Sequence, residues 1–369
     1  MMSKEKRRVP KLRFPGFTED WERRKLTSFT QRVKGNDGRM DLPTLTISAS
    51  EGWLNQKDRF SANIAGSEQK NYTLLRQGEL SYNHGNSKLA KYGVVYALQE
   101  YKEALVPRVY HSFKVDESHD ALFVEYYFST KRPDRELRKL ISSGARMDGL
   151  LNIGYDEFTN ISISLPTFSE QKQIVALLKV CDKNITVHQR KIEHLNLKKK
   201  ALLQKLFPQN GECYPEHRFP GFTDAWEQRE LSSLTKYIGT GKSRFVIKEY
   251  GEYAILGSTN VIGYDDSYDY DGNFILTARV GANAGQLYRY SGKVKITDNT
   301  VFLMSDSSQF IYYSLSHFDL RRLSFGTGQP LVKSSELQKL KLCVPVSKSE
   351  QEKIGEIFNN IDNIITLHQ

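Results

Sequence analysis

Apolar side chains recur with a four-three spacing along residues 169–207, a stretch that contains neither proline nor glycine. Such a spacing, sustained over about five heptads, predicts one long helix that packs along another helix. At roughly 1.5 Å per residue this helix would extend about 57 Å and serve as a spacer. The expected seam consists of Ile174, Leu178, Cys181, Ile185, His188, Ile192, Leu195, Lys199, Leu202 and Leu206.

The sequence repeats itself at two places that enclose different interiors. Residues 349–369 match the start of the long helix at an offset of 180, and residues 218–231 match residues 13–26 at an offset of 205. The matching framing boxes read RFPGFTEDWERRKL and RFPGFTDAWEQREL. A frame repeated around different contents predicts two domains built on one plan. The second seam consists of Ile354, Phe358, Ile361, Ile365 and His368.

The repeats divide the chain into six segments and predict an α+β protein. These are a lead-in with the first framing box (1–26), a mixed α/β domain (27–164), the first long helix (165–207), a linker with the second framing box (208–231), a second mixed α/β domain (232–344) and a shortened second helix (345–369). Short β-like runs are expected at 42–47, 78–82, 92–98, 106–113, 253–256, 273–279, 294–297 and 300–304, and helices at 121–128, 134–141 and 309–320. The two long helices are expected to pack along one another as a coiled coil.

Composition and charge narrow the class of partner. The 369 residues are 39% hydrophobic and 26% charged, with a formal net charge of +10. A basic chain favours a polyanionic partner such as nucleic acid. No apolar run is long enough for a bilayer, and the basic start lacks the apolar core of a secretory signal, so we expect no membrane association. Cys181, Cys213 and Cys343 lie far apart, which excludes a local zinc site and predicts reduced thiols in the cytoplasm.

Motifs for catalysis are weak. Residues 239–243 (GTGKS) resemble part of a phosphate loop, but the position that should hold its first glycine is Lys236. The acids in residues 133–138 (PDRELR) fall within one helical turn, whereas a metal-dependent nuclease needs carboxylates from separate elements. No nucleophile elbow, zinc-protease motif or dinucleotide fingerprint occurs. The sequence therefore predicts a chain without a catalytic centre and without a bound metal.

Two pairs of loops are the candidate binding elements. Residues 80–88 align with residues 276–284 at an offset of 196, and each loop follows a β-like run and bends at a glycine. Residues 143–147 and 325–333 end the two interiors in a similar way. Amide, hydroxyl and cationic side chains can contact base edges and phosphates, although such residues also build ordinary turns and solvated loops. The candidates are Asn83, His84, Asn86, Ser87, Lys88, Arg146, Lys242, Ser243, Arg244, Arg279, Asn283, Thr327, Gln329 and Lys333.

The duplicated RFPGF…W boxes, the S-E-Q helix starts that follow a proline, and the G-A-R and G-T-G-Q-P-L-V loops resemble the specificity subunit of type I restriction-modification systems. The resemblance covers nearly the whole chain. It implies two target-recognition domains held apart by two antiparallel helices, each domain reading one half of an asymmetric, bipartite double-stranded DNA target. It also implies a non-catalytic subunit that binds two methyltransferase subunits and two motor-endonuclease subunits.

The same resemblance assigns the cofactors to the partners. S-adenosylmethionine for adenine methylation, and ATP with Mg²⁺ for DNA cleavage, are expected in the partner subunits and not on this chain. Two other interpretations stay open: a coiled-coil scaffold or DNA-binding protein outside restriction-modification, and an enzyme in its own right. We also expect His188 and His368 to meet as a polar mark that fixes the register of the two helices.

Overall fold

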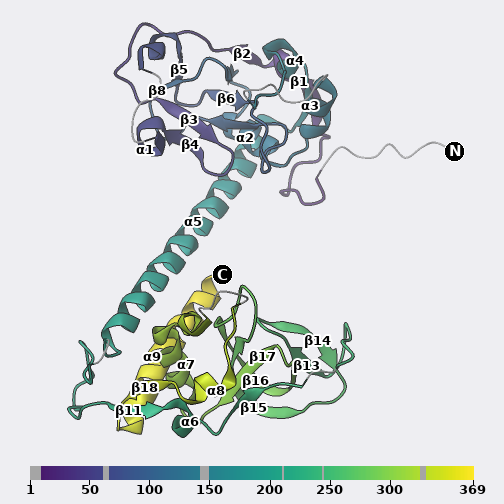
Figure 1. Ribbon diagram of the computed structural model, residues 1–369. Helices are drawn as coiled ribbons and strands as arrows, with labels where there is room; N and C mark the ends of the chain where they lie inside the picture. Colours follow the sequence, from purple (N-terminus) through teal and green to yellow (C-terminus); the bar gives the residue numbers. More distant parts are fainter. Residues whose placement is uncertain (1–9, 61–65, 142–148, 210–211, 243–244, 325–329) are drawn as a thin grey trace, which may run out of the picture. The chain divides into compact units, whose positions relative to one another are not determined.

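The computed structural model describes residues 10–60, 66–141, 149–209, 212–242, 245–324 and 330–369. The chain divides into two compact units, Met1–Asn184 and Ile185–Gln369. The boundary falls inside the long helix α5 (Phe168–Lys205), so that each unit contains part of this helix (Figure 1). Among the helices of the described residues, none combines the length and the apolar composition that crossing a membrane requires.

The first unit is built around a four-stranded antiparallel sheet in the order β2-β9-β6-β7. Its strands are β2 (Thr30–Arg32), β6 (Leu80–Asn83), β7 (Val94–Ala97) and β9 (His111–Val115). Three antiparallel pairs accompany it: β1 (Glu22–Lys25) with β10 (Ser162–Leu165), β3 (Leu45–Ser48) with β4 (Gly52–Asn55), and β5 (Thr73–Arg76) with β8 (Glu103–Val106). The helices are α1 (Gln56–Phe60), α2 (Ala121–Ser129), α3 (Asp134–Leu140), α4 (Tyr155–Thr159) and the start of α5.

Burial alternates from residue to residue in β3, β7 and β10, as expected of strands with one covered face. One predicted strand needs correction. The run at 106–113 is not one strand, because β8 ends at Val106 and β9 begins at His111. Between them the amide of Tyr110 donates to the carbonyl of Pro107 over 3.0 Å, which closes a turn. Proline has no amide hydrogen to extend a ladder, so the chain leaves the sheet at this position.

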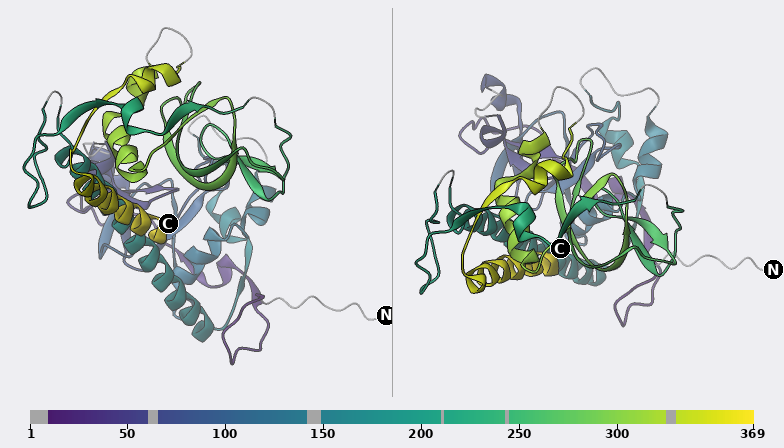
Figure 2. Two further views of the ribbon diagram at one scale, coloured as in Figure 1. Left: turned by 90° about the horizontal axis from the view of Figure 1, so that it is seen from below. Right: turned by 60° about the horizontal axis from the view of Figure 1, so that its bottom comes forward.

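The second unit contains a six-stranded sheet in the order β12-β17-β15-β16-β13-β14, which curls strongly in Figure 2. Its strands are β12 (Tyr237–Thr240), β13 (Tyr253–Leu256), β14 (Val261–Asp265), β15 (Tyr270–Ala278), β16 (Leu287–Ile296) and β17 (Thr300–Met304). A separate antiparallel pair joins β11 (Glu227–Glu230) to β18 (Lys341–Val344). The helices are α6 (Leu231–Leu234), α7 (Ser308–Phe318), α8 (Ser334–Gln338), α9 (Lys348–His368) and the end of α5.

The curled sheet of the second unit separates two groups of buried side chains. Leu276 and Phe302 belong to one group, which lies among the strands themselves. Ile275 and Leu303, on the opposite face, pack with α7 and α9 through Phe310. Alternate residues of β15 and β17 therefore serve two cores, as the two-residue period of a strand requires.

In each unit the framing box closes onto the start of a long helix. Arg13 donates two hydrogen bonds of 2.7 Å to the carboxylate of Glu170, and Arg218 donates two of 2.7 and 2.8 Å to that of Glu350. Both glutamates are buried. The strand at the end of each box pairs antiparallel with the strand that precedes each helix, β1 with β10 and β11 with β18. The recurring sequence thus corresponds to recurring contacts that tie the beginning of each domain to its end.

Candidate functional site

In the first unit the predicted loop after β6 contacts residues 149–151, and the predicted loop 143–147 lies outside the described residues. The loop after β6 and the segment after residue 148 are joined by an antiparallel bridge between Gly85 and Leu150. The amide of Asn86 donates to the carbonyl of Gly149 over 2.9 Å, and the amide of Leu151 donates to the carbonyl of His84 over 2.8 Å. We call residues 83–88 the first reading loop.

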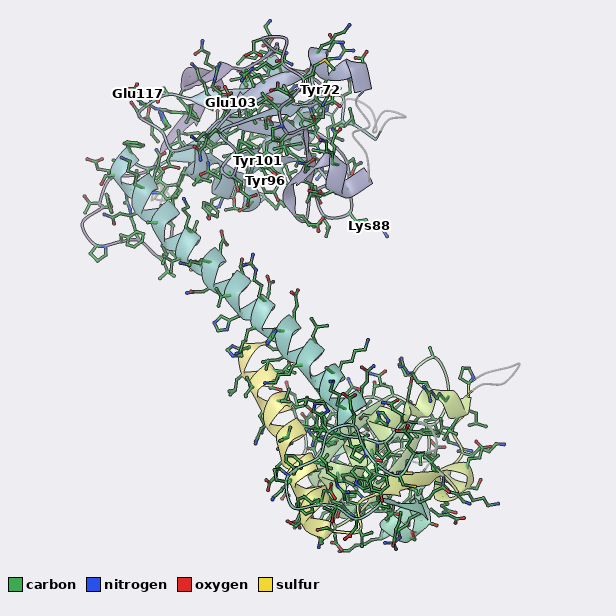
Figure 3. The ribbon with its side chains drawn as sticks, turned by 90° about the vertical axis from the view of Figure 1, so that its left-hand side faces the viewer. Tyr72, Lys88, Tyr96, Tyr101, Glu103 and Glu117 are labelled. Atoms are coloured by element: carbon green, nitrogen blue, oxygen red, sulfur yellow. The ribbon has the colours of Figure 1, made fainter. Side chains whose placement is uncertain are left out.

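The first reading loop carries polar side chains on its outer side. Asn86, Ser87 and Lys88 are exposed, and Lys88 points away from the body of the unit (Figure 3). Asn83 is half-buried, with its side-chain amide donating to the carbonyl of Ile47 over 3.2 Å. An amide, a hydroxyl and an ammonium group on one loop suit contacts to base edges and phosphate oxygens.

The second unit repeats this arrangement with different residues. After β15, an antiparallel bridge joins Val280 to Leu331. The amide of Gly281 donates to the carbonyl of Pro330 over 3.1 Å, and the amide of Val332 donates to the carbonyl of Arg279 over 2.8 Å. We call residues 279–284 the second reading loop. Its bend depends on Gly281, whose φ of +87° lies in the left-handed region that favours glycine.

Both reading loops connect hairpin neighbours, β6 to β7 and β15 to β16. In the second loop Asn283 is exposed and Arg279 is half-buried. Each unit therefore joins the loop of a central hairpin to the segment that leads toward its long helix. The shared backbone scaffold presents different side chains in the two units.

Several predicted residues are placed differently. Arg146, Ser243, Arg244, Thr327 and Gln329 lie outside the described residues. Of the predicted cations near them, Lys242 is exposed and donates to Asp269 over 2.9 Å, and this hydrogen bond raises the pKa of Lys242. Lys333 is also exposed, with its ammonium group 3.4 Å from Glu336. Both lysines can exchange these surface carboxylates for another anion at small cost.

His84 needs correction as a candidate for direct contact. Only 6% of its surface is exposed, and both ring nitrogens face backbone carbonyl oxygens. A side chain enclosed in this way cannot reach a ligand on the surface. It supports the reading loop from inside.

Only some residues of the predicted helix seam pack between α5 and α9. Within the second unit, Leu195 of α5 packs with Ile361 and Ile365 of α9, and Ile192 lies against this cluster. Further along, Lys199 donates to Asp362 over 2.6 Å. Contacts pair rising residue numbers on α5 with falling numbers on α9, so the two segments run antiparallel.

The remaining seam residues have other neighbours. Ile354 and Phe358 pack in the core below α7. In the first unit Ile174 packs against the domain core, Leu178 lines a groove of about 750 Å³ beside α2, and Ile185 is 53% exposed.

His188 and His368 lie together, as the heptad register predicts. Their Nδ1 atoms are 2.7 Å apart and their ring centres 4.9 Å apart. This distance fits a hydrogen bond in which one of the two ring nitrogens donates to the other. The pair stands where α9 ends, next to the exposed face of α5.

Sequence reasoning missed two recurrent polar contacts. One is the arginine–glutamate pair of the framing boxes, which the recurrence of both residue types in the repeat could have suggested. The other joins the domain to its helix: the hydroxyl of Tyr126 donates to Asp182 over 2.6 Å, and that of Tyr313 donates to Asp362 over 2.7 Å. These contacts fix each helix against its own domain. Within the described residues, no group of three or more histidine, cysteine, aspartate or glutamate side chains could hold a metal ion.

Comparison with known protein families gives one match over most of the chain. A model described as the type I restriction modification DNA specificity domain matches residues 55–197 and 223–369. The two matched segments contain both reading loops, all of α9 and most of α5.

Individual relatives are more distant. The chain is 25% identical over 284 residues to the type I restriction enzyme MjaVIII specificity subunit of Methanocaldococcus jannaschii, a match that covers 67% of this chain and 65% of that protein. It is 27% identical over 115 residues to the type I restriction enzyme EcoprrI specificity subunit of Escherichia coli, covering 30% of this chain and 28% of that protein. The chain therefore spans less than two thirds of either curated relative. The crystal structure of the type I restriction-modification S subunit from M. genitalium matches with a TM-score of 0.69 at 14% identity, over 98% of this chain and 94% of that one. At this identity the match establishes a common fold.

Proposed function

Because the chain belongs to the type I restriction modification DNA specificity family, we propose that it recognises the DNA target of a type I restriction-modification complex. Each unit would read one half of an asymmetric, bipartite sequence in double-stranded DNA. The observation that carries this proposal is the pair of loop junctions, Gly85 with Leu150 and Val280 with Leu331, which occupy equivalent places in the two units. The net charge of +10 favours the phosphate contacts that such recognition needs.

The long helices would form an antiparallel coiled coil that sets the spacing between the half-sites and binds the methyltransferase subunits. The contacts of Leu195 with Ile361 and Ile365 support this pairing. The repeated framing contacts of Glu170 and Glu350 support a pseudo-twofold relation between the two halves. We place S-adenosylmethionine, ATP and Mg²⁺ in the methyltransferase and motor-endonuclease subunits, which would carry out the chemistry.

A methylation map tests the proposal directly. DNA from cells that express this chain with its cognate methyltransferase subunit should carry one interrupted, asymmetric motif, with adenine modified on both strands. Exchanging residues 232–344 for the corresponding domain of a relative should change one half of the motif and leave the other half and the spacer unchanged. A continuous motif, or a change in both halves, would contradict the assignment of one half-site to each unit.

A coiled-coil scaffold without a DNA role predicts a different result. Such a protein would give no motif, and its complex with the methyltransferase subunit would bind DNA without preference for any sequence. A stand-alone enzyme would methylate or cut DNA without any partner.

A further inference from the structure

The segment that follows α7 packs directly against the end of the second reading loop. Leu320 is buried in the core of the second unit, whereas its neighbour Arg321 is exposed. At Gly285, the residue after the loop, an added Cβ would lie 2.6 Å from the amide nitrogen and 2.8 Å from the Cα of Arg321. Glycine, here with a φ of +85°, permits this close approach. The packing of the backbone therefore fixes Arg321 beside the reading loop.

The reading loop and this segment border one hollow of about 410 Å³. Its lining includes Asn283 and Gln286 on the side of the loop, and Ser316, Asp319 and Arg321 at the end of α7. The side chains of Asn283 and Gln286 are exposed. Amide groups and a guanidinium around one hollow supply the directional donors and acceptors that base edges require.

Asp319 orients the guanidinium of Arg321. Nε of the arginine donates to one carboxylate oxygen over 2.7 Å, and Nη2 donates to the other over 2.9 Å. Asp319 is itself held in a left-handed conformation, with a φ of +60°, where its amide donates to the carbonyl of Leu315 over 3.1 Å. The hydrogen bond from Arg321 also lowers the pKa of Asp319, so that the carboxylate is ionised at neutral pH. A guanidinium carries five N–H groups in a rigid fork, enough to bind this carboxylate and a base edge together.

The carboxylate also determines which part of DNA suits the arginine. A lysine or arginine without a nearby carboxylate is attracted by any phosphate, whereas the pair of Asp319 and Arg321 has no net charge and gains little from a polyanion. Its N–H groups keep fixed directions, and a guanidinium can donate to both O6 and N7 of guanine in the major groove. The side chain of Arg321 is 70% exposed, so a base edge can reach it. The arrangement therefore favours a base over a phosphate.

We propose that Arg321 recognises a guanine in the half-site of the second unit, and that Asp319 is the positioning residue that orients it. The inference rests on the proposed DNA-recognition function. It adds to that function one base and the residue that selects it. Both residues lie outside the loops that the sequence identified as candidates.

The first unit is built differently at the corresponding place. Its helix α2 corresponds to α7, because each supplies the tyrosine, Tyr126 or Tyr313, that donates to an aspartate of a long helix. The left-handed residue after α2 is Lys131, also with a φ of +60°. A cation thus stands where the second unit has the carboxylate of Asp319. The proposed contact belongs to one half-site, and the other half-site is an internal control.

The experiment uses the full chain in complex with its methyltransferase subunit. A methylation map of the wild type gives both half-sites, and the one that changes on exchange of residues 232–344 belongs to the second unit. That half-site should contain at least one G·C pair. Competition binding then compares the cognate duplex with duplexes changed at each position of each half-site.

Replacing Arg321 by glutamine should remove discrimination at one G·C pair of the second half-site. The expected loss is about five- to hundredfold, the range for a bidentate contact with a base, and all other positions should keep their discrimination. Placing 7-deazaguanine, which lacks the N7 acceptor, at that pair should weaken binding by the wild type and leave Arg321→Gln unaffected. Arg322→Gln is the matched control, because it removes the same charge from the next exposed residue and should keep the wild-type discrimination.

A variant of Asp319 tests the positioning role. Asparagine tolerates the left-handed conformation, so Asp319→Asn should keep the end of α7 while removing the charge that orients the guanidinium. Discrimination at the same G·C pair should fall by less than in Arg321→Gln. Affinity for all duplexes should rise, because a guanidinium without its carboxylate is attracted by phosphates. A residue with only a structural role would not increase the affinity for unrelated sequences.

Three results would overturn the inference. They are a second half-site without any G·C pair, a loss of discrimination in the first half-site, and an Arg321→Gln variant that binds all duplexes equally more weakly with a salt slope lower by about 1, as a phosphate contact predicts. A wild type that prefers no sequence would contradict the proposed function and the inference with it. A wild type that recognises both half-sites, together with an Arg321→Gln variant that does so unchanged, would contradict the inference alone.

Discussion

Replacing Arg218 by methionine should destabilise the second unit strongly, because it leaves a buried carboxylate without its cation. Glu350 is 1% exposed, and its two oxygens accept hydrogen bonds of 2.7 and 2.8 Å from the guanidinium. This contact also raises the pKa of Arg218. Removal of one member of a buried pair costs about 3–5 kcal/mol. The side chain of Arg218 is 15% exposed, so water can enter where it stood, and we expect the lower end, about 3 kcal/mol.

Urea unfolding of the isolated chain measures this cost as the change in the free energy of unfolding. Arg229→Met is the matched control, since Arg229 is exposed on β11, in the same framing segment, and its loss should cost less than about 0.5 kcal/mol. Adding Glu350→Gln to Arg218→Met should recover part of the lost stability, because a neutral amide needs no cation.

If Arg218→Met costs no more than Arg229→Met, the ion pair of Arg218 with Glu350 does not stabilise the second unit. A double replacement as unstable as the sum of the two single ones would also contradict the pairing, because coupled residues depart from additivity. A large loss would instead establish that the recurring arginine and glutamate of the frame hold each domain to its helix.

Three further outcomes are expected. Burial raises the pKa of Glu125 to about 7 from 4.5, so the stability linked to its proton is full below pH 4.5 and is lost as pH rises toward 7. Glu125→Gln should therefore increase the free energy of unfolding at pH 8 by up to about 3 kcal/mol, since its amide oxygen can still accept from the amide of Ala97. Urea unfolding at several pH values should show a flatter stability profile for this variant. Lys88→Ala should weaken DNA binding about equally for matched and changed half-sites and lower the salt slope of the binding constant by about 1, whereas a change confined to one sequence would contradict a phosphate contact. Replacing His188 and His368 together by leucine should raise the free energy of unfolding but allow α5 and α9 to pair in a shifted register, which cross-links between engineered cysteines would detect. Stabilisation with a single register would show that the two histidines do not fix the register of the helices.

The sequence alone determined the long helix, the repeated frame and the bend at Gly281. These features depend on local chemistry: a heptad forms a helix wherever its seam is buried, and a glycine such as Gly281 bends a loop through a left-handed conformation that other residues rarely adopt. The position of α5 followed from spacing alone, within one or two residues. The likeness of the two framing boxes also indicated that they perform the same task.

Only the tertiary structure decided which distant residues meet. Gly85 joins Leu150, and Arg218 reaches Glu350, because strand pairing and domain closure bring these segments together over long stretches of chain. Composition could not separate His84, enclosed by carbonyl groups, from its exposed neighbour Asn86, because burial depends on the path of the chain around a residue. The periodicity of a sequence predicts which faces of its helices and strands are buried, whereas the tertiary structure determines which residues cover those faces.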